Sequence, residues 1–464
     1  MYITKILKYS QNLRHNIYAV SSGSLPSAIA IVRLSGKDSL DHIKKLTRKT
    51  NIIPRQLFYS PLYDKKNNLI DRSMVVYLDG PNTFTGEDTV EFFVHGSRAV
   101  VRCLCDELST FHNTDSAKAG EFTRRALLNS KMNVAQVEAL SDLISADSES
   151  QRQQALKSDS IGSIMKPLRK RILKLTSHYE ALIDFAEDVV EMNNDSIIGE
   201  AKEIINYLNK LIKSSHRGTL IKEGINVVLI GKTNVGKSSL MNCITEKDIS
   251  IISNIHGTTR DYIETKIQLN GYLVTITDTA GIRNNSNDIL EIEGIRRSIK
   301  KANNADIIVM VIDGSNCNNI MDEVNFLKKE IEFNNKMKCI ICINKKDLFN
   351  NDNLKVNSLD NIVSTSTINS NGIDELINIL SKETSNIINM NSINSEFILS
   401  QQRHIQLVKK SKDSLENFIK NSKIDSAIAG EDLRDCCNYI GEITGVIVNE
   451  DILDNIFSTF CIGK

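Results

Sequence analysis

The segment Gly231-Lys-Thr-Asn-Val-Gly-Lys-Ser238 constrains the fold of this 464-residue chain more than any other feature. It follows the apolar run 225–230 and precedes residues with helical spacing. A glycine-containing turn between a strand and a helix lets backbone N–H groups converge on phosphate. Lys237 is then expected to reach the β- and γ-phosphates of a nucleotide, and the Ser238 hydroxyl to bind Mg²⁺. The pattern predicts a phosphate-binding loop inside an α/β unit.

Further motifs follow in the order of a guanine-nucleotide site. Asp278-Thr-Ala-Gly281 ends an apolar strand, which places Asp278 to orient Mg²⁺ and the Gly281 amide to meet the γ-phosphate. The polar loop 257–261 lies between the two motifs, and Thr259 is our candidate to complete the Mg²⁺ shell.

The segment Asn344-Lys-Lys-Asp347 follows another apolar run. Asp347 can accept hydrogen bonds from the ring N–H and the 2-amino group of guanine, and adenine lacks that amino group. The segment that begins at Ser366 is a candidate base-contacting loop. The motifs together predict GTP as the nucleotide.

One polar residue is missing from the pattern. Ras-like proteins place a glutamine just after the Asp-x-x-Gly motif to orient the attacking water, and this chain has Ile282 there. Glu291 is a candidate to orient the water, and Asn234 has an oxygen that could hold a cation. The alternative for Glu291 is a solvated carboxylate at the start of a helix.

The hydrophobic patterns change along the chain. Residues 1–130 alternate strand-like runs (28–34, 73–78, 89–96) with short helical patterns such as 39–49, and residues 131–222 have helical spacing almost without turns. Residues 223–384 alternate short apolar runs with helical stretches, which is typical of a parallel sheet with crossover helices. Residues 385–464 complete the helical domain: a linker lies near 387–396, and helical spacing returns from 401 to 457. We therefore expect an N-terminal α/β domain and a discontinuous helical domain, with a P-loop domain inserted in the latter.

Composition limits the partners. The chain carries 57 basic and 57 acidic residues, so a nucleic acid would have to be held by a local basic patch and not by a global field. No apolar run is long enough to cross a bilayer, and residues 1–20 resemble neither a signal peptide nor an anchor, although they could be a weak import leader. Cys339 and Cys342 form a Cys-x-x-Cys in an apolar run, which we interpret as a buried strand and not as a metal or redox site.

Several longer segments resemble one known protein family, and the resemblance covers nearly the whole chain. The chain resembles the MnmE (TrmE) family of tRNA-modification GTPases. The resemblance rests on segments 29–36, 81–91, 119–144, 231–242, 256–261, 278–283, 441–445 and 460–464. The sequences PNTFTGED, within 81–91, and FCIGK, at 460–464, separate this family from other GTPases with the same loop.

The resemblance implies a homodimer formed through an N-terminal domain that binds a folate derivative, either 5-formyl- or methylene-tetrahydrofolate. It also implies an FAD-containing partner of the MnmG type, in a heterotetramer or larger complex. Together they would build a carboxymethylaminomethyl or aminomethyl group onto C5 of the tRNA wobble uridine. The sequence itself does not fix the compartment; we take bacterial cytoplasm as the default, with an organelle as the alternative.

The resemblance also implies site residues. Folate would be contacted by Arg33, Glu91, Lys131 and Lys464; Glu291 would orient the water; Ser238 and Thr259 would bind Mg²⁺; and Asn234, Ser253, Ile255 and Thr258 would hold K⁺. The motifs and the resemblance together place the following residues at GTP: Asn234, Val235, Gly236, Lys237, Ser238, Ser239, Ser253, Asn254, Ile255, His256, Gly257, Thr258, Thr259, Asp278, Thr279, Ala280, Gly281, Asn344, Lys345, Asp347 and Ser366. Cys461, near the end of the chain, could be a nucleophile activated by Lys464, but we expect a small packing residue.

Two rival functions remain. A ribosome-assembly GTPase would act as a switch without covalent RNA chemistry, but we find neither a second phosphate loop nor a Gly-x-x-Gly loop of the KH type. A membrane-associated GTPase switch would need an anchor, and the sequence shows none.

Overall fold

The computed structural model describes all residues except 1–14, 185–193, 248–250, 257–261, 280–288, 318, 334–336, 350–360, 390–397, 446–452 and 454–455. These residues form two compact units, one of residues 1–141 with 441–464 and one of residues 142–440. Helices α5 (Val134–Ile144) and α14 (Ser426–Thr444) run across these limits. In the described part of the chain, no helix is long and apolar enough to cross a membrane.

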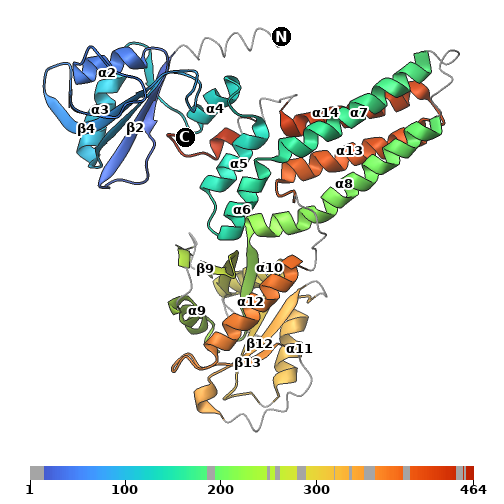
Figure 1. Cartoon of the computed structure of the whole chain (residues 1–464). Helices are drawn as coiled ribbons and strands as arrows, with labels where there is room; N and C mark the ends of the chain where they lie inside the picture. The colour runs from blue at the N-terminus through green and yellow to red at the C-terminus, as the bar shows by residue number, and fades with distance from the viewer. Residues whose placement is uncertain are drawn as a thin grey trace. The chain divides into compact units, whose positions relative to one another are not determined.

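The first unit is built on a six-stranded sheet with the order β3-β4-β5-β2-β1-β6 (Figure 1). Its strands are β1 (Asn16–Val20), β2 (Ile29–Ser35), β3 (Phe58–Tyr63), β4 (Leu69–Leu78), β5 (Thr89–His95) and β6 (Thr114–Ser116). Neighbouring strands are antiparallel except β1 and β6. The strands predicted from the runs 28–34, 73–78 and 89–96 are confirmed as β2, β4 and β5.

Alternation along the strands decides which face of this sheet is buried. In β2, Ala30, Val32 and Leu34 are fully buried, and they pack in one core with the apolar residues of α2 (Ser39–Thr47) and α3 (Arg98–Ser109). The opposite face of β1 packs against Phe122 of α4 (Glu121–Leu128). The helix predicted within 39–49 is confirmed as α2.

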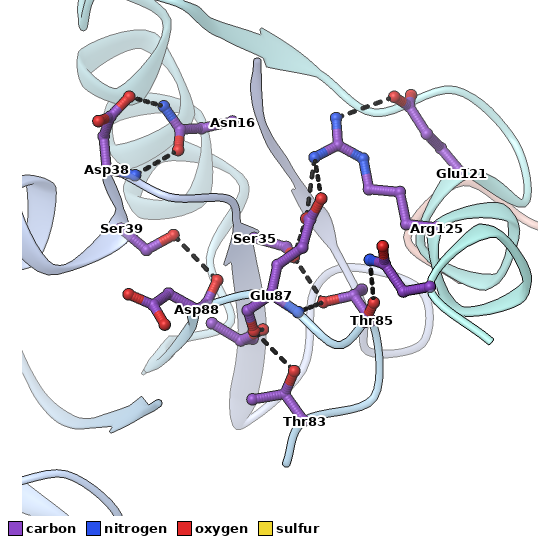
Figure 2. Close-up of polar contacts among 12 residues, drawn as sticks. Asn16, Ser35, Asp38, Ser39, Thr83, Thr85, Glu87, Asp88, Glu121 and Arg125 are labelled. Carbon is purple, nitrogen blue, oxygen red and sulfur yellow. Dashed lines mark hydrogen bonds and ion pairs between the residues drawn. The ribbon is translucent and has the colours of Figure 1, made fainter. Parts of the chain in front are cut away.

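A buried ion pair holds the loop 81–88 against this sheet (Figure 2). Arg125 of α4 is 3% exposed, and its Nη1 lies 2.9 Å from Oε2 of Glu87. The same Glu87 oxygen accepts a hydrogen bond from Ser35 Oγ at 2.9 Å, and Ser35 Oγ lies 2.8 Å from Thr85 Oγ1. Asn129 donates to the Thr85 carbonyl at 2.6 Å. The loop is therefore fixed from both β2 and the region around α4.

The end of the chain is attached to the start of the same unit. Ile462 forms an isolated antiparallel bridge with Ala119, and Ser21 Oγ donates to the Gly463 carbonyl at 2.8 Å. Gly463 has a φ of +99°, and a Cβ there would lie 2.0 Å from the Val20 carbonyl oxygen. Only glycine therefore fits this position.

The second unit contains a seven-stranded sheet with the order β13-β12-β11-β7-β10-β9-β8. Its strands are β7 (Ile225–Ile230), β8 (Ile251–His256), β9 (Tyr262–Leu269), β10 (Tyr272–Thr279), β11 (Ile307–Asp313), β12 (Lys338–Asn344) and β13 (Ile362–Ser364). In the order of the sheet, the neighbours from β13 through β12, β11 and β7 to β10 are parallel, whereas β9 is antiparallel to both β8 and β10. The predicted parallel sheet is confirmed, with an antiparallel extension that we did not predict.

Helices cover the sheet and also form a separate helical part. The helices that accompany the sheet are α9 (Lys237–Glu246), α10 (Ile289–Asn303), α11 (Ile320–Glu330) and α12 (Ile373–Asn389). The helical part contains α6 (Glu149–Ser158), α7 (Ile161–Asp184), α8 (Asn194–Glu223) and α13 (Gln402–Asn421), and α8 packs against both α7 and α13 (Figure 1). The predicted fold class is confirmed, since helical segments come before and after the P-loop part. The predicted domain limits at residues 130, 222 and 384 stay predictions.

Candidate nucleotide-binding site

The phosphate loop connects β7 to α9. Asn234 and Gly236 have positive φ angles of 62° and 95°, which curl the loop before the helix starts at Lys237. A Cβ on Gly236 would lie 2.3 Å from Asn344 Nδ2, so glycine is required for the close approach of the Asn344 side chain. The loop and the N-terminus of α9 together form an anion-binding turn.

Lys237 points into the interior of this loop. Its side chain is buried, and Nζ donates to the carbonyls of Gly231 at 3.2 Å and Lys232 at 3.0 Å. Burial lowers the pKa of Lys237, and the nearby charge of Asp278 opposes that shift. A phosphate bound in the loop would supply the anionic partner that two carbonyl oxygens do not.

Asp278 and Ser238 meet beside the loop because β10 runs parallel to β7, with Asp278 opposite Leu229. Ser238 Oγ donates to Asp278 Oδ2. The other carboxylate oxygen, Oδ1, is buried without a hydrogen-bond partner, and burial raises the pKa of Asp278. An anionic oxygen without a donor beside a hydroxyl fits the ligand chemistry of a divalent cation. The Thr279 hydroxyl donates instead to the Leu229 carbonyl at 2.6 Å, so it holds the two strands together.

The segment 344–347 is attached to the phosphate loop. Asn344 is fully buried, and its Nδ2 donates to the Val235 carbonyl at 2.9 Å. Lys345 adopts a φ of +66°, and its Nζ lies 2.6 Å from Asp313 Oδ2. Ser366 Oγ donates to Asp347 Oδ1. The structure thus brings together the predicted loop, the predicted base-recognising aspartate and the predicted Ser366.

Thr365 is a functional residue that the motifs did not single out. It is fully buried, and its hydroxyl donates to Asn344 Oδ1 at 3.2 Å. Together with the Val235 contact, this bond fixes the orientation of the Asn344 amide. A hydroxyl residue directly before Ser366 was the available signal in the sequence.

Several predicted residues are placed only in part. Ser239 is exposed on α9, and the backbone of Ser253, Asn254, Ile255 and His256 lies in β8. Glu291 lies in the first turn of α10, but its side chain lies outside the described residues. Gly257, Thr258, Thr259, Ala280 and Gly281 also lie outside the described residues.

Two of the four residues predicted for folate, Arg33 and Glu91, form an ion pair, and a third, Lys131, lies against the same loop 81–88 that Arg33 contacts. Arg33 Nη2 lies 2.9 Å from Glu91 Oε1, and the guanidinium lies 5.9 Å from the ring centroid of Phe84 in the loop 81–88. Lys131 packs against Gly86 of the same loop, with its Cε 3.3 Å from where a Cβ on Gly86 would stand.

The fourth predicted residue, Lys464, lies in the same unit. It is half-buried and directly follows Gly463, whose carbonyl accepts the hydrogen bond from Ser21. Within the described residues, the Lys464 side chain makes no hydrogen bond or ion pair with the other three residues.

The cysteines give one confirmation and one correction. Cys339 and Cys342 lie on opposite faces of β12, packed into different cores, which confirms the buried-strand interpretation. Among the described residues, no cluster of histidine, cysteine or acidic residues could hold a metal ion. Cys461 is exposed, so its interpretation as a packing residue is wrong. The bridge of Ile462 with Ala119 orders the tail without burying the thiol.

A phosphate loop, an aspartate bonded to its serine and an Asn-Lys-Lys-Asp segment bonded to its backbone define the class of P-loop GTPases. Family models extend this class to the rest of the chain: the MnmE helical domain matches residues 134–461, and the N-terminus of the GTP-binding protein TrmE matches residues 16–131. The chain belongs to the MnmE family of tRNA modification GTPases, and it is a GTP-hydrolysing enzyme.

Individual relatives agree with this assignment. The tRNA modification GTPase MnmE of Aquifex aeolicus is 39% identical, with 97% of this chain and 100% of the relative covered. That of Rickettsia bellii (strain OSU 85-389) is 37% identical, over 97% and 99%. The mitochondrial tRNA modification GTPase gtpbp3 of Dictyostelium discoideum is 35% identical, over 97% and 96%.

Among solved structures, the G domain of the T. maritima FeoB iron transporter is 23% identical, with a TM-score of 0.26, over 35% of this chain and 98% of that one.

Proposed function

We propose that the protein couples GTP hydrolysis to modification of the wobble uridine of tRNA, adding an aminomethyl or carboxymethylaminomethyl group to C5. A folate derivative would supply the one-carbon unit, and FAD on an MnmG-type partner would serve the redox steps. The observation that carries this proposal is the ordered tail. Residues 462–463 contact β1 and Ala119 in the same unit that holds the Arg33–Glu91 pair. A GTPase acting only as a switch has no evident need for that arrangement.

At the nucleotide, Lys237 would bind the β- and γ-phosphates, and Asp347 and Ser366 would contact guanine. Mg²⁺ would be held by Ser238 and Thr259, with Asp278 orienting its shell. The buried Oδ1 of Asp278, which has no donor, supports a cation here. Binding of the cation would relieve the unfavourable burial of the carboxylate charge. The other loop and strand residues predicted for GTP would surround the phosphates.

Hydrolysis needs groups that this chain supplies in an unusual way. Ile282 replaces the water-orienting glutamine, so we assign that role to Glu291 in the first turn of α10. A K⁺ ion, held by Asn234 with Ser253, Ile255 and Thr258, would offset the charge that develops between the β- and γ-phosphates. Asn234 supports this assignment because it is exposed on the curled loop.

The folate derivative would be held by Arg33, Glu91, Lys131 and Lys464. The side chains present suit a pterin: Glu91 offers acceptors for an aminopyrimidinone edge, and Phe84 is 41% exposed beside Arg33. The exposed Cys461 thiol lies in the same tail, and we assign it no chemical step.

A homodimer through the N-terminal domain is supported by the sheet face opposite α2 and α3. Ile31, Phe93, Met74 and Tyr59 are cross-strand neighbours in one row over four strands, and Tyr59 is 59% exposed. An apolar row of this kind marks a protein–protein contact. The dimer would combine with the MnmG-type partner in a heterotetramer or larger complex, in the bacterial cytoplasm, with an organelle as the alternative location.

The test is mass spectrometry of wobble nucleosides from cells that lack the protein. We expect loss of the C5 modification, restored by the native chain but not by a chain with Lys237→Ala. The Lys237→Ala chain is the matched control for a GTP requirement. Unchanged nucleosides in the deletion strain would favour a switch without RNA chemistry.

A further inference from the structure

A cluster of basic side chains lies on the surface of the first unit. It contains none of the residues proposed to bind folate. This basic patch consists of Lys44, Lys45, Arg48, Lys49, Lys65, Lys66, Arg98 and Arg102. The acidic residues around it are Asp41, Asp64, Asp106 and Glu107. The patch therefore has a positive excess, although the whole chain has a formal net charge of zero.

The patch is continuous because its two halves share neighbours. Lys65, Lys66, Arg98 and Arg102 line one open hollow of about 650 Å³. Arg48, the C-cap residue of α2, donates to the carbonyl of Asp64 at 3.5 Å, and Asp64 also lines the hollow. The basic end of α2 and the hollow therefore form one surface.

The acidic residues at the hollow already have partners. Asp106 Oδ2 lies 3.7 Å from Arg102 Nε of the patch itself. The Asp64 carboxylate accepts from the backbone of Lys66 and from both the backbone and side chain of Asn68, and these bonds hold its pKa below the usual range, the Asn68 side chain most of all. Glu107 is buried and accepts from the Lys65 backbone N–H at 3.1 Å. Within the described residues, neither the Lys65 nor the Lys66 ammonium group forms an ion pair with a carboxylate, although the Lys66 charge contributes to the lowered pKa of Asp64. Both ammonium groups remain available to an external anion.

Aromatic rings support the basic side chains at the end of α2. Arg48 lies 4.9 Å from the ring centroid of Tyr63, and Lys49 Nζ lies 4.5 Å from that of Phe58. Lys45 Nζ lies 5.5 Å from the ring of Phe111. Such contacts hold long side chains in place while their charges stay in water, so less entropy is lost when they bind.

We propose that this basic patch binds the phosphate backbone of the RNA substrate. A wide, open hollow with a row of cations beside it suits a polyanion and not a small anion. Phosphate contacts of this kind position an RNA without reading its sequence. The inference rests on the proposed function, because it assigns the tRNA of that proposal to a surface. The patch lies on the α2 and α3 side of the sheet, so it stays free when the apolar row of the opposite face forms a dimer (Figure 1).

The test is fluorescence anisotropy of a labelled tRNA transcript with the full-length protein between 50 and 200 mM KCl. The variant neutralises three exposed cations of the hollow (Lys65→Gln, Lys66→Gln, Arg102→Gln). The matched control neutralises three exposed lysines of α8 and α13 (Lys202→Gln, Lys210→Gln, Lys409→Gln). We expect the dissociation constant of the patch variant to rise about tenfold or more at 100 mM salt, and the slope of log K against log salt to fall by about 2–3. The control should bind nearly as the native protein does.

Three outcomes would overturn the patch. The first is native-like affinity and salt slope in the patch variant. The second is an equal loss in the control, which would indicate a diffuse field. The third is a patch variant that binds tRNA as the native protein does but no longer binds phosphatidylglycerol vesicles, which would make the patch a membrane-binding surface. GTP turnover checks folding, and it should be unchanged in both variants. If the native protein binds no tRNA, the proposed function fails with the patch, whereas failure of the variant alone to weaken binding refutes only the patch.

Discussion

Removing the Glu87 carboxylate should leave the Arg125 guanidinium buried and poorly paired. Arg125 is 3% exposed, and after Glu87→Ala its remaining acidic partner is Glu121, at 3.5 Å. Breaking a buried ion pair by removing one partner costs about 3–5 kcal/mol. We expect the lower end, about 3 kcal/mol, because Glu121 keeps part of the interaction.

The size of the first unit converts this free energy into a temperature. An unfolding entropy of about 2.1 cal/mol/K per residue gives about 0.35 kcal/mol/K for a unit made of residues 1–141 and 441–464. A loss of about 3 kcal/mol should therefore lower the Tm of this unit by about 9 °C.

Scanning calorimetry can separate this transition from that of the nucleotide-binding unit. Saturating GDP stabilises only the unit that binds it, so the transition that does not move with GDP belongs to the first unit. The cycle is completed by Arg125→Ala and by the double variant, for which we expect a coupling energy of about 2 kcal/mol. A Tm change below about 2 °C in Glu87→Ala, or a coupling near zero, would refute the claim that this pair fixes the loop 81–88.

The remaining predictions concern the nucleotide, the tail and one thiol. Asp347→Asn should weaken GTP binding by about 10–1,000-fold and favour xanthosine triphosphate in equilibrium titrations, and no gain for xanthosine would remove Asp347 from the base. GTP turnover should rise at least about tenfold when K⁺ replaces Na⁺ at equal ionic strength, which corresponds to about 1.4 kcal/mol of barrier. Equal rates in the two salts would defeat the cation argument. Glu291→Ala should lower GTP turnover while GTP affinity is retained. Deleting residues 461–464 should abolish wobble modification with most GTP turnover kept, and parallel loss of both would make the tail structural. Cys342 is buried, and burial raises its pKa to about 12, so thiol reagents should leave it unmodified at pH 8; labelling of Cys342 in the folded protein at pH 8 would contradict its burial.

The nucleotide-binding part was largely predictable because its signals are local. Each signal is an apolar run followed within a few residues by a glycine turn or by a polar motif residue, and the structure confirms β7, β10 and β12 at the predicted runs. Strand β3 was missed because Pro61 argues against a strand, yet β3 lies at the sheet edge, where a missing N–H donor is tolerated. Strand β1 was missed because we interpreted residues 1–20 only as a question about targeting.

The Glu87–Arg125 pair could not be predicted from local patterns. The two residues are 38 positions apart, and each looks like an ordinary surface charge in its own segment. Thr365 was missed for a related reason, because its partner Asn344 is 21 positions away and only the pairing of β12 with β13 brings them together. Contacts of this kind depend on tertiary packing, which a single sequence encodes without a periodic signal.

The bond between Ser21 and Gly463 also orders events during synthesis. The two residues are 442 positions apart, and at about 5–20 residues per second a ribosome needs roughly 20–90 s to make the chain between them. Strand β1 can therefore enter its sheet long before its C-terminal neighbour exists. The tail can dock only after residues 462–463 have emerged from the ribosome, so the first unit cannot complete this contact while the nucleotide-binding part is still being made.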